Sequence, residues 1–176
     1  MKKVPKKILL LTVSILIIFA QWYFIEKPKQ KNDDAEIKDA ELVRVVDGDT
    51  VVLKINGKNE KIRLIGMDSP ESVKPNHPVE CFGIEASTHA KEILKNKDLR
   101  FKSDYSQDTR DRYGRLLGYI YMYEENFAEK MITDGYAYEY TYRKSNPYRY
   151  QSDFKKAESK ARKNKNGLWA DDACSE

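Results

Sequence analysis

Cysteine is scarce in this sequence, with two residues among 176, and histidine is equally rare. The two cysteines, Cys81 and Cys174, lie far apart, so the short paired spacings of structural zinc modules are missing. No cysteine follows the apolar N-terminal run, which excludes a lipoprotein anchor. We expect a disulfide between Cys81 and Cys174 in an exported domain. Free thiols are one alternative, and a zinc site that also uses His77 and His89 is the other.

The chain also lacks an excess of positive charge outside its first seven residues. Its formal net charge is +4, and Lys2, Lys3, Lys6 and Lys7 supply all of it. Without these four lysines, the remaining 28 basic residues balance 28 acidic residues. Overall charge therefore does not favour nucleic-acid binding, and any attraction to a polyanion must come from local clusters.

One long hydrophobic run is present, at residues 8–25, directly after those lysines. About 18 apolar residues is near the minimum for a helix that crosses a bilayer. Lysines next to such a helix stay in the cytoplasm, so the rest of the chain is expected outside. We expect residues 1–25 to be a retained signal anchor. A cleaved signal peptide is the alternative, because Ala20 suits a cleavage site although Ile18 does not.

The segment after the apolar run is polar. Residues 26–40 are rich in charge and contain no aromatic residue, so they cannot bury apolar surface. We expect a linker over residues 26–40 and a globular domain over residues 41–176. This domain would be extracytoplasmic, attached to the membrane through residues 8–25 or secreted if the N-terminus is cleaved.

Runs rich in β-branched residues predict five short strands, at residues 42–46, 50–55, 61–65, 99–102 and 116–123. Tight turns are expected at Asp47-Gly48 and Asn56-Gly57. Helical patterns begin at Gly83, run from Asn126 to Gly135, and run from about Tyr148 to Lys165. These elements fit an α+β fold built on a five-stranded Greek-key barrel of the OB type with three helices. An open α+β sheet is the competing architecture.

Three motifs follow one another along this domain, before a tyrosine-rich segment. They are Asp47-Gly48-Asp49-Thr50, Arg63 with Asp68-Ser69-Pro70-Glu71, and Tyr113-Gly114-Arg115. Each motif alone is a weak signal, since a hairpin turn or a helix start explains the first two. Together, in this order, they resemble the staphylococcal nuclease (thermonuclease) family over residues 41–172. The resemblance implies an OB-type barrel and calcium-dependent cleavage of DNA and RNA.

The resemblance assigns one Ca²⁺ ion to the carboxylates of Asp49 and Asp68 and to the backbone carbonyl of Ser69. Calcium prefers oxygen ligands and completes its coordination with water. Asp49 ends a turn and Asp68 ends the third strand, so two strand ends can converge on one ion. Asp47 and Thr50 would lie beside the ion without binding it. The family often has threonine in place of Ser69, a change that a backbone ligand tolerates.

The catalytic residues implied by the resemblance are Glu71, Arg63 and Arg115. Glu71 would deprotonate or orient the attacking water, which must be held in line with the leaving oxygen. Attack on a phosphodiester places negative charge on the equatorial oxygens, and a guanidinium matches two of them at once. The two arginines would therefore stabilise a phosphorane-like transition state.

Four further residues are expected to bind nucleic acid. Tyr113 resembles a family tyrosine that contacts a terminal phosphate, and Arg112 stands where the family often has lysine. Tyr140 and Tyr142 match the family's base-stacking pair after a one-residue shift. Aromatic rings interleaved with cations suit unpaired bases, so single-stranded or unwound DNA and RNA are the expected partners, with no obligate protein partner. Packing within a strand or loop is the alternative for the tyrosines.

The sequence thus predicts an extracytoplasmic calcium-dependent endonuclease. The alternative is a non-catalytic OB-fold module that binds single-stranded nucleic acid or protein. The nuclease prediction requires that folding bring three acids and two guanidinium groups around a single ion.

Overall fold

The computed structural model describes residues 36–72 and 78–174. No helix within these two ranges is long and apolar enough to cross a membrane. The predicted anchor and most of the predicted linker, residues 1–35, lie outside the described residues.

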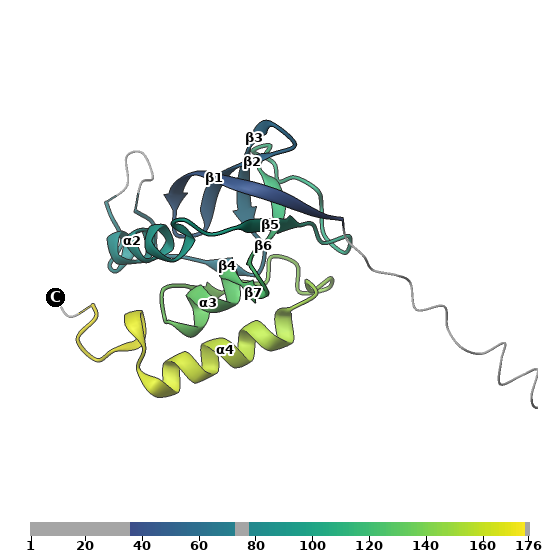
Figure 1. Ribbon diagram of the computed structural model, residues 1–176. Helices are drawn as coiled ribbons and strands as arrows, with labels where there is room; N and C mark the ends of the chain where they lie inside the picture. The colour runs from purple at the N-terminus through teal and green to yellow at the C-terminus, as the bar shows by residue number, and fades with distance from the viewer. Residues whose placement is uncertain (1–35, 73–77, 175–176) are drawn as a thin grey trace, which may run out of the picture. The chain divides into compact units, whose positions relative to one another are not determined.

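Five strands in the described residues close into a barrel (Figure 1). They are β1 (Ile37–Asp47), β2 (Thr50–Ile55), β3 (Lys58–Leu64), β5 (Leu99–Lys102) and β6 (Leu116–Met122). β1 pairs antiparallel with β2 and with β5, β2 pairs with β3, and β5 pairs with β6. A parallel pairing of β3 with β6 closes the ring. The predicted barrel is confirmed, and the open sheet is wrong.

The first strand begins earlier than the sequence suggested. Residues 37–40 were assigned to the linker, but Ile37 pairs with Lys102 and Ala40 pairs with Leu99. These residues are held by backbone hydrogen bonds to β5, which do not depend on apolar side chains. The high charge of residues 26–40 therefore led to a linker prediction that includes the start of β1. The predicted end of the linker at residue 40 is wrong, because β1 begins at Ile37.

The turns between strands agree with the sequence. Asn56 and Gly57 connect β2 to β3 with φ angles of 51° and 77°, the left-handed values that a two-residue hairpin turn requires. Asp47 pairs with Thr50 across the β1–β2 turn. Alternate residues of β2, including Val51 and Leu53, are fully buried in the barrel.

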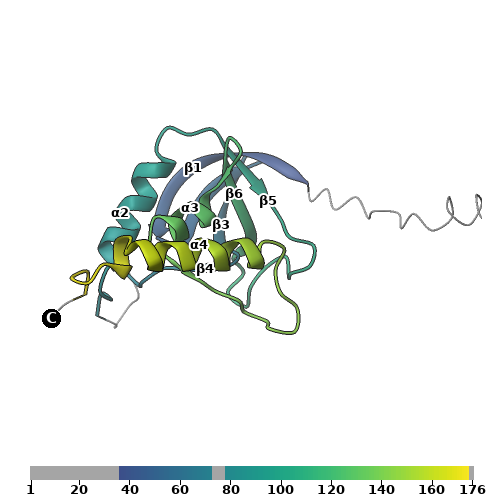
Figure 2. The same ribbon diagram turned by 90° about the horizontal axis from the view of Figure 1, so that it is seen from below.

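Three short strands and the helices complete the described domain. The strands are β4 (Met67–Asp68), β7 (Glu125–Asn126) and β8 (Tyr138–Glu139); the helices are α2 (Gly83–Leu94), α3 (Phe127–Thr133), α4 (Gln151–Asn164) and the 3₁₀ helix η1 (Gly167–Trp169). α2 packs against β1, whereas α3 lies between β6 and α4 (Figures 1 and 2). β4 pairs with β8 outside the barrel.

The start of α3 agrees with the sequence prediction, whereas the start of α4 differs from it. The side chain of Asn126 accepts hydrogen bonds from the amides of Ala128 and Glu129, as its capping position predicted. α4 begins at Gln151, later than expected, because Tyr148 is buried in the core and its hydroxyl donates to the carbonyl of Gly66. Tertiary packing of this tyrosine therefore takes precedence over the helical pattern.

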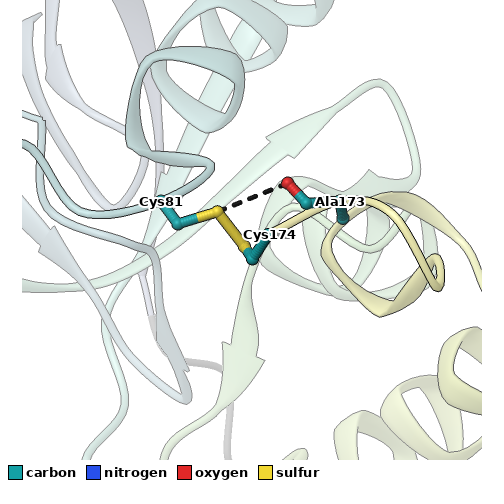
Figure 3. The surroundings of a disulfide bond; sticks show 3 residues. All are labelled: Cys81, Ala173 and Cys174. Atoms are coloured by element: carbon teal, nitrogen blue, oxygen red, sulfur yellow. Dashed lines mark hydrogen bonds between the residues drawn. A yellow bond between two sulfur atoms is a disulfide. The ribbon is translucent and has the colours of Figure 1, made fainter. Parts of the chain in front are cut away.

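Cys81 and Cys174 form a disulfide across 93 residues of sequence (Figure 3). With both sulfurs bonded to each other, the zinc alternative that uses these cysteines is wrong. His89, another residue of that alternative, lies with its Nε2 2.9 Å from Asp134 Oδ2. His77 lies outside the described residues.

A buried carboxylate anchors the loop that follows β5. Asp104 accepts hydrogen bonds from the Tyr119 hydroxyl (2.7 Å), the Ser106 hydroxyl (2.7 Å) and the Arg149 amide (3.1 Å). Burial opposes ionisation of Asp104, but these hydrogen bonds outweigh it and hold its pKa below the ordinary 3.8.

We expect Tyr119→Phe to lower the free energy of unfolding by about 1–3 kcal/mol near pH 7, since a buried carboxylate loses a donor. Asp104 titrates lower in the folded state, so its contribution is present above the unfolded pKa near 3.8 and is lost as pH falls through the lower folded value. The variant's stability deficit should shrink over the same range. Urea unfolding between pH 7 and pH 2 measures this effect. Tyr123→Phe, at a ring that is 82% exposed, is the control, and an equal loss there would contradict the prediction.

Candidate active site

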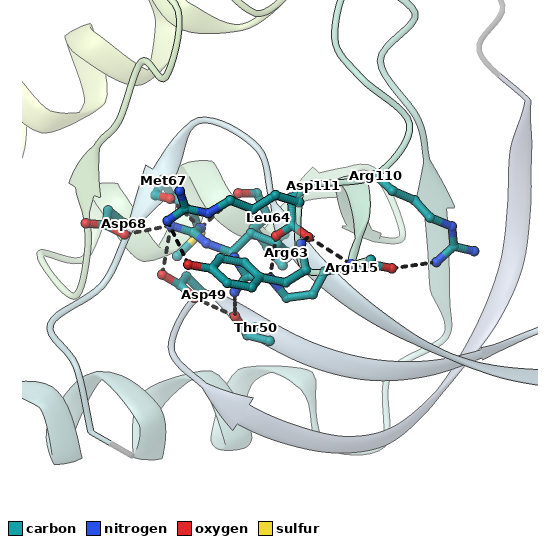
Figure 4. A network of polar contacts seen from close by, with 12 residues as sticks. Asp49, Thr50, Arg63, Leu64, Met67, Asp68, Arg110, Asp111 and Arg115 are labelled. Carbon is teal, nitrogen blue, oxygen red and sulfur yellow. Dashed lines mark hydrogen bonds and ion pairs between the residues drawn. The ribbon is translucent and has the colours of Figure 1, made fainter. Parts of the chain in front are cut away.

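Arg63 brings together two of the predicted carboxylates (Figure 4). Its Nη2 atom lies 3.0 Å from Asp49 Oδ2 and 2.6 Å from Asp68 Oδ1. Its Nη1 atom donates to the carbonyls of Leu64 (3.0 Å) and Met67 (2.7 Å). The side chain is only 13% exposed, so these contacts fix the guanidinium at the barrel surface. Residues from two separate sequence motifs therefore contact one another in the fold.

Strand pairing places these groups. Thr50 and Arg63 face each other across β2 and β3, which sets the guanidinium beside the β1–β2 turn. The carbonyl of Asp49 accepts a hydrogen bond from the Leu64 amide at 3.0 Å. Gly48 permits this arrangement, because a Cβ there would lie 2.6 Å from the Ser69 hydroxyl. The turn can therefore pack directly on the segment that carries Asp68.

Burial and nearby charges act in opposite directions on the ionisation of Asp68, which lies close to Asp49. Burial raises the pKa of Asp68 to about 6; the Arg63 guanidinium opposes this shift, and the neighbouring Asp49 carboxylate adds to it. Asp49 itself is 8% exposed, and it accepts hydrogen bonds from the Thr50 hydroxyl (2.7 Å) and the Ser69 amide (3.4 Å). Asp49 and Asp68 are close together, and Arg63 is the positive charge that contacts both. A second positive charge beside them would further stabilise their ionised forms.

The possible oxygen ligands are few. Across residues 36–72 and 78–174, no cluster of three His, Cys, Asp or Glu side chains is arranged to hold a metal. Ser69 is buried, and its hydroxyl has no hydrogen-bond partner in the described residues. A cation at this point would thus bind Asp49, Asp68 and backbone or water oxygens, a donor set that suits a hard ion such as Ca²⁺.

Arg115 reaches the same site through Thr50. Its Nη1 lies 3.5 Å from the Thr50 hydroxyl, which in turn donates to Asp49. Arg115 directly precedes β6, and the parallel pairing of β6 with β3 brings the two arginines to neighbouring strands. The structure therefore gathers Asp49, Asp68, Arg63 and Arg115, as the sequence predicted.

Glu71 lies beside Asp47 at the edge of this group. Burial and the adjacent Glu71 carboxylate raise the pKa of Asp47, although hydrogen bonds from Ser72 and Gly48 oppose the shift. The Ser72 hydroxyl donates to Asp47 Oδ1 at 2.7 Å. The predicted acids thus form two neighbouring pairs, Asp49 with Asp68 and Asp47 with Glu71, rather than one cluster of three.

The chain is similar to known nucleases. The family described as "Staphylococcal nuclease homologue" matches residues 61–171. The thermonuclease of Staphylococcus hyicus is 34% identical over 97% of this chain and 99% of its own length. The thermonuclease of Staphylococcus intermedius is also 34% identical, over 96% of this chain and 99% of its own. The prophage-derived endonuclease YokF of Bacillus subtilis is 37% identical over 77% of this chain and 45% of its own length.

The chain belongs to the staphylococcal nuclease family. It is therefore a nuclease, and so a hydrolase, as the sequence predicted.

The remaining predicted residues of this nuclease lie farther out. Tyr113 is 67% exposed, with the guanidinium carbons of Arg112 and Arg115 4.8 Å and 5.4 Å from its ring centre. Tyr140 lies beside the β3–β4 turn, because its amide donates to the Gly66 carbonyl at 3.0 Å. Tyr142 is 73% exposed, and its ring lies 5.9 Å from the Arg143 guanidinium. Tyr140 and Tyr142 both lie beyond the end of β8, which covers only Tyr138–Glu139.

Asp111 is not among the predicted site residues, but it contacts one of them. Its Oδ2 lies 2.5 Å from Arg115 Nε, and its Oδ1 accepts from the amides of Tyr113 and Arg115, both at 2.9 Å. The signal was present in the sequence, because an acid three residues before Gly114 is typical of a turn. Asp111 therefore orients both the guanidinium and the backbone that carries it.

We expect Asp111→Asn to lower kcat of this nuclease by about 10- to 100-fold, because a misplaced guanidinium stabilises the transition state poorly. Asparagine retains the backbone contacts and loses the charged partner of Nε. Initial rates on single-stranded DNA measure the change. Asp153→Asn, an exposed ion pair on α4, serves as the control. A kcat equal to that of the control would contradict the assignment.

Proposed function

We propose that this nuclease is a calcium-dependent endonuclease that hydrolyses phosphodiester bonds of DNA and RNA outside the cytoplasm. The observation that carries the proposal is the convergence of Asp49 and Asp68 on Arg63, at 3.0 Å and 2.6 Å, with Arg115 one residue away through Thr50. An acidic pair suits a divalent cation, and a guanidinium pair suits a phosphate.

Asp49, Asp68 and the carbonyl of Ser69 are the proposed calcium ligands. The Thr50 hydroxyl orients Asp49 by donating to its Oδ1, and Asp47 lies beside the ligands without binding the ion. Bound calcium would supply positive charge to the reacting phosphate and hold a water near it. Bound calcium would oppose the rise that burial causes in the pKa of Asp68, because a neighbouring cation favours the ionised carboxylate.

Glu71 is the proposed general base, or the group that orients the attacking water. A base must lie within hydrogen-bond reach of the proton that it removes, either directly or through one water. Its position beside Asp47, next to the Asp49 turn, is compatible with that role. A proton taken from water by Glu71 leaves a hydroxide aligned for attack on phosphorus.

Arg63 and Arg115 are the proposed partners of the equatorial phosphate oxygens. In the described structure Arg63 Nη2 contacts the two carboxylates that we assign to calcium. Two positive groups between the same carboxylates would repel each other. We therefore expect Arg63 to move its Nη2 toward the phosphate while Nη1 keeps the Leu64 and Met67 carbonyls.

Arg112, Tyr113, Tyr140 and Tyr142 are the proposed contacts to the nucleic-acid strand. The exposed tyrosine rings would stack on unpaired bases, and the guanidinium of Arg112 would attract phosphates. Single-stranded or unwound polymer is therefore the preferred substrate. The domain is proposed to lie outside the cell, anchored through residues 8–25 or released after cleavage, with its barrel beginning at Ile37.

The decisive test is digestion of single-stranded DNA by the full-length chain with calcium and then with excess EGTA. We expect cleavage only with calcium. Activity that is indifferent to the chelator would overturn the proposed metal role.

Arg115→Lys should lower kcat by about 100- to 1,000-fold, because lysine is a point charge and cannot contact two phosphate oxygens at once. Steady-state kinetics on single-stranded DNA measure this loss. Arg44→Lys, at an exposed position on β1, makes the same substitution away from the site and should leave kcat unchanged. If both variants cleave at the wild-type rate, Arg115 has no role in the transition state.

Calcium should also raise thermal stability, by about 2.7 kcal/mol at 100 times its Kd, because it binds only the folded state. Asp49→Asn should abolish this calcium-dependent stabilisation while the apo protein remains folded. Scanning calorimetry with and without calcium measures the shift. An Asp49→Asn protein that is stabilised as much as wild type would exclude Asp49 as a ligand.

A further inference from the structure

The backbone of Glu71 is held by Glu80, nine residues later in the chain. Its amide donates to Glu80 Oε2 at 2.9 Å, and its carbonyl accepts from the Glu80 amide, also at 2.9 Å. One residue therefore satisfies both the donor and the acceptor of the Glu71 main chain. The side chain and the backbone of Glu80 fix Glu71 together.

The start of α2 also lies against the Glu71 backbone. A Cβ on Gly83 would lie 2.5 Å from the Glu71 carbonyl oxygen, closer than any side chain can approach. The Gly83 amide also donates to the Glu80 carbonyl at 2.9 Å. Residues 80–83 thus form a tight turn against the Glu71 peptide, which leaves little freedom for that backbone to shift.

The disulfide ties this turn to the C-terminal segment. Cys81 follows Glu80 directly and is bonded to Cys174, and its Sγ lies 3.3 Å from the Ala173 carbonyl (Figure 3). The C-terminal segment is itself anchored, because Leu168 is buried and its amide donates to the Gly135 carbonyl at 2.8 Å. The cross-link therefore connects the support of Glu71 to the end of α3.

We propose that Glu80, pinned by the Cys81–Cys174 disulfide, is a positioning residue that holds Glu71 in its working orientation. This inference rests on the proposed role of Glu71 in activating water. Small displacements of a catalytic group carry large costs in rate. The disulfide is thus part of the catalytic apparatus as well as a cross-link of the fold.

Glu80 has a second effect that an experiment must separate from the first. Its charge also contributes to the raised pKa of Asp68. Glu80→Gln removes the charge but keeps an oxygen that accepts from the Glu71 amide. Glu80→Ala removes both, so the pair of variants distinguishes positioning of Glu71 from electrostatic influence on Asp68.

The experiment compares kcat and KM of the full-length variants on single-stranded DNA with saturating calcium. Glu80→Ala should lower kcat by about 10- to 100-fold with KM and the calcium midpoint within about twofold of wild type. Glu80→Gln should retain kcat within about threefold. Glu85→Ala, an exposed glutamate in the first turn of α2, is the matched control and should leave both constants unchanged. The proposal is overturned if Glu80→Ala cleaves like wild type, or if Glu80→Gln loses as much as Glu80→Ala.

The disulfide is tested with the paired substitution Cys81→Ser and Cys174→Ser. Circular dichroism at the assay temperature first establishes that this variant is folded. We expect its kcat to fall by about tenfold at unchanged KM. A folded variant with wild-type kcat removes the disulfide from the proposal. If the variant does not fold, the Glu80 variants alone decide the outcome.

A double-mutant cycle asks whether Glu80 acts through Glu71. In a Glu71→Gln background, Glu80→Ala should lower the residual rate by less than about twofold. A further loss as large as in wild type would overturn the proposal, because Glu80 would then act elsewhere. A wild-type chain without calcium-dependent cleavage would instead refute the proposed function, and that result is read before any variant is compared.

Discussion

The parallel pairing of β3 with β6 is the constraint on which the site depends. It joins strands that are separated by β4, α2 and β5 in the sequence, and it closes the barrel. Without it, β3 and β6 would be separated by β2, β1 and β5 in an open sheet, and Arg63 would lie far from Arg115. Closure pairs Ile62–Leu64 of β3 with Leu116–Gly118 of β6, so backbone hydrogen bonds hold the parts of both strands that carry or adjoin the two arginines.

Charge balance explains how a domain with no net excess of positive charge can bind a polyanion. The arginines of the site are each tied to a carboxylate, Arg63 to Asp49 and Asp68, and Arg115 to Asp111. Such pairs hold each guanidinium in place before substrate arrives, at the cost of partial neutralisation. The cation proposed for Asp49 and Asp68 would add positive charge at this point, so attraction for phosphate would be strongest where we propose that cleavage occurs.

The backbone of Glu71 is supported by contacts that extend, through a disulfide, to the C-terminal segment. Glu80 and Gly83 contact its backbone, and the disulfide carries that support to the C-terminal segment. The sequence alone offered Cys81 and Cys174 as a cross-link of an exported domain, and did not connect them with catalysis. The sequence places Cys81 directly after Glu80, and only the fold brings Glu80 against the backbone of Glu71.

The sequence by itself determined the strands, the turns and the chemical types in the site, because alternation of apolar residues, Asn-Gly and Asp-Gly turns, and carboxylates beside arginines are local features. Tertiary structure decided the rest. Residues 37–40 join β1 because β5 offers backbone partners, and Tyr148 leaves the helix because the core encloses its ring. The acids divide into two pairs because contacts between residues far apart in the chain depend on how the barrel closes. Asp111 and Glu80 acquire roles through nearer contacts, at spacings of four and nine residues, which form only once the turn before β6 and the start of α2 are folded. Such contacts leave no periodic trace in the sequence.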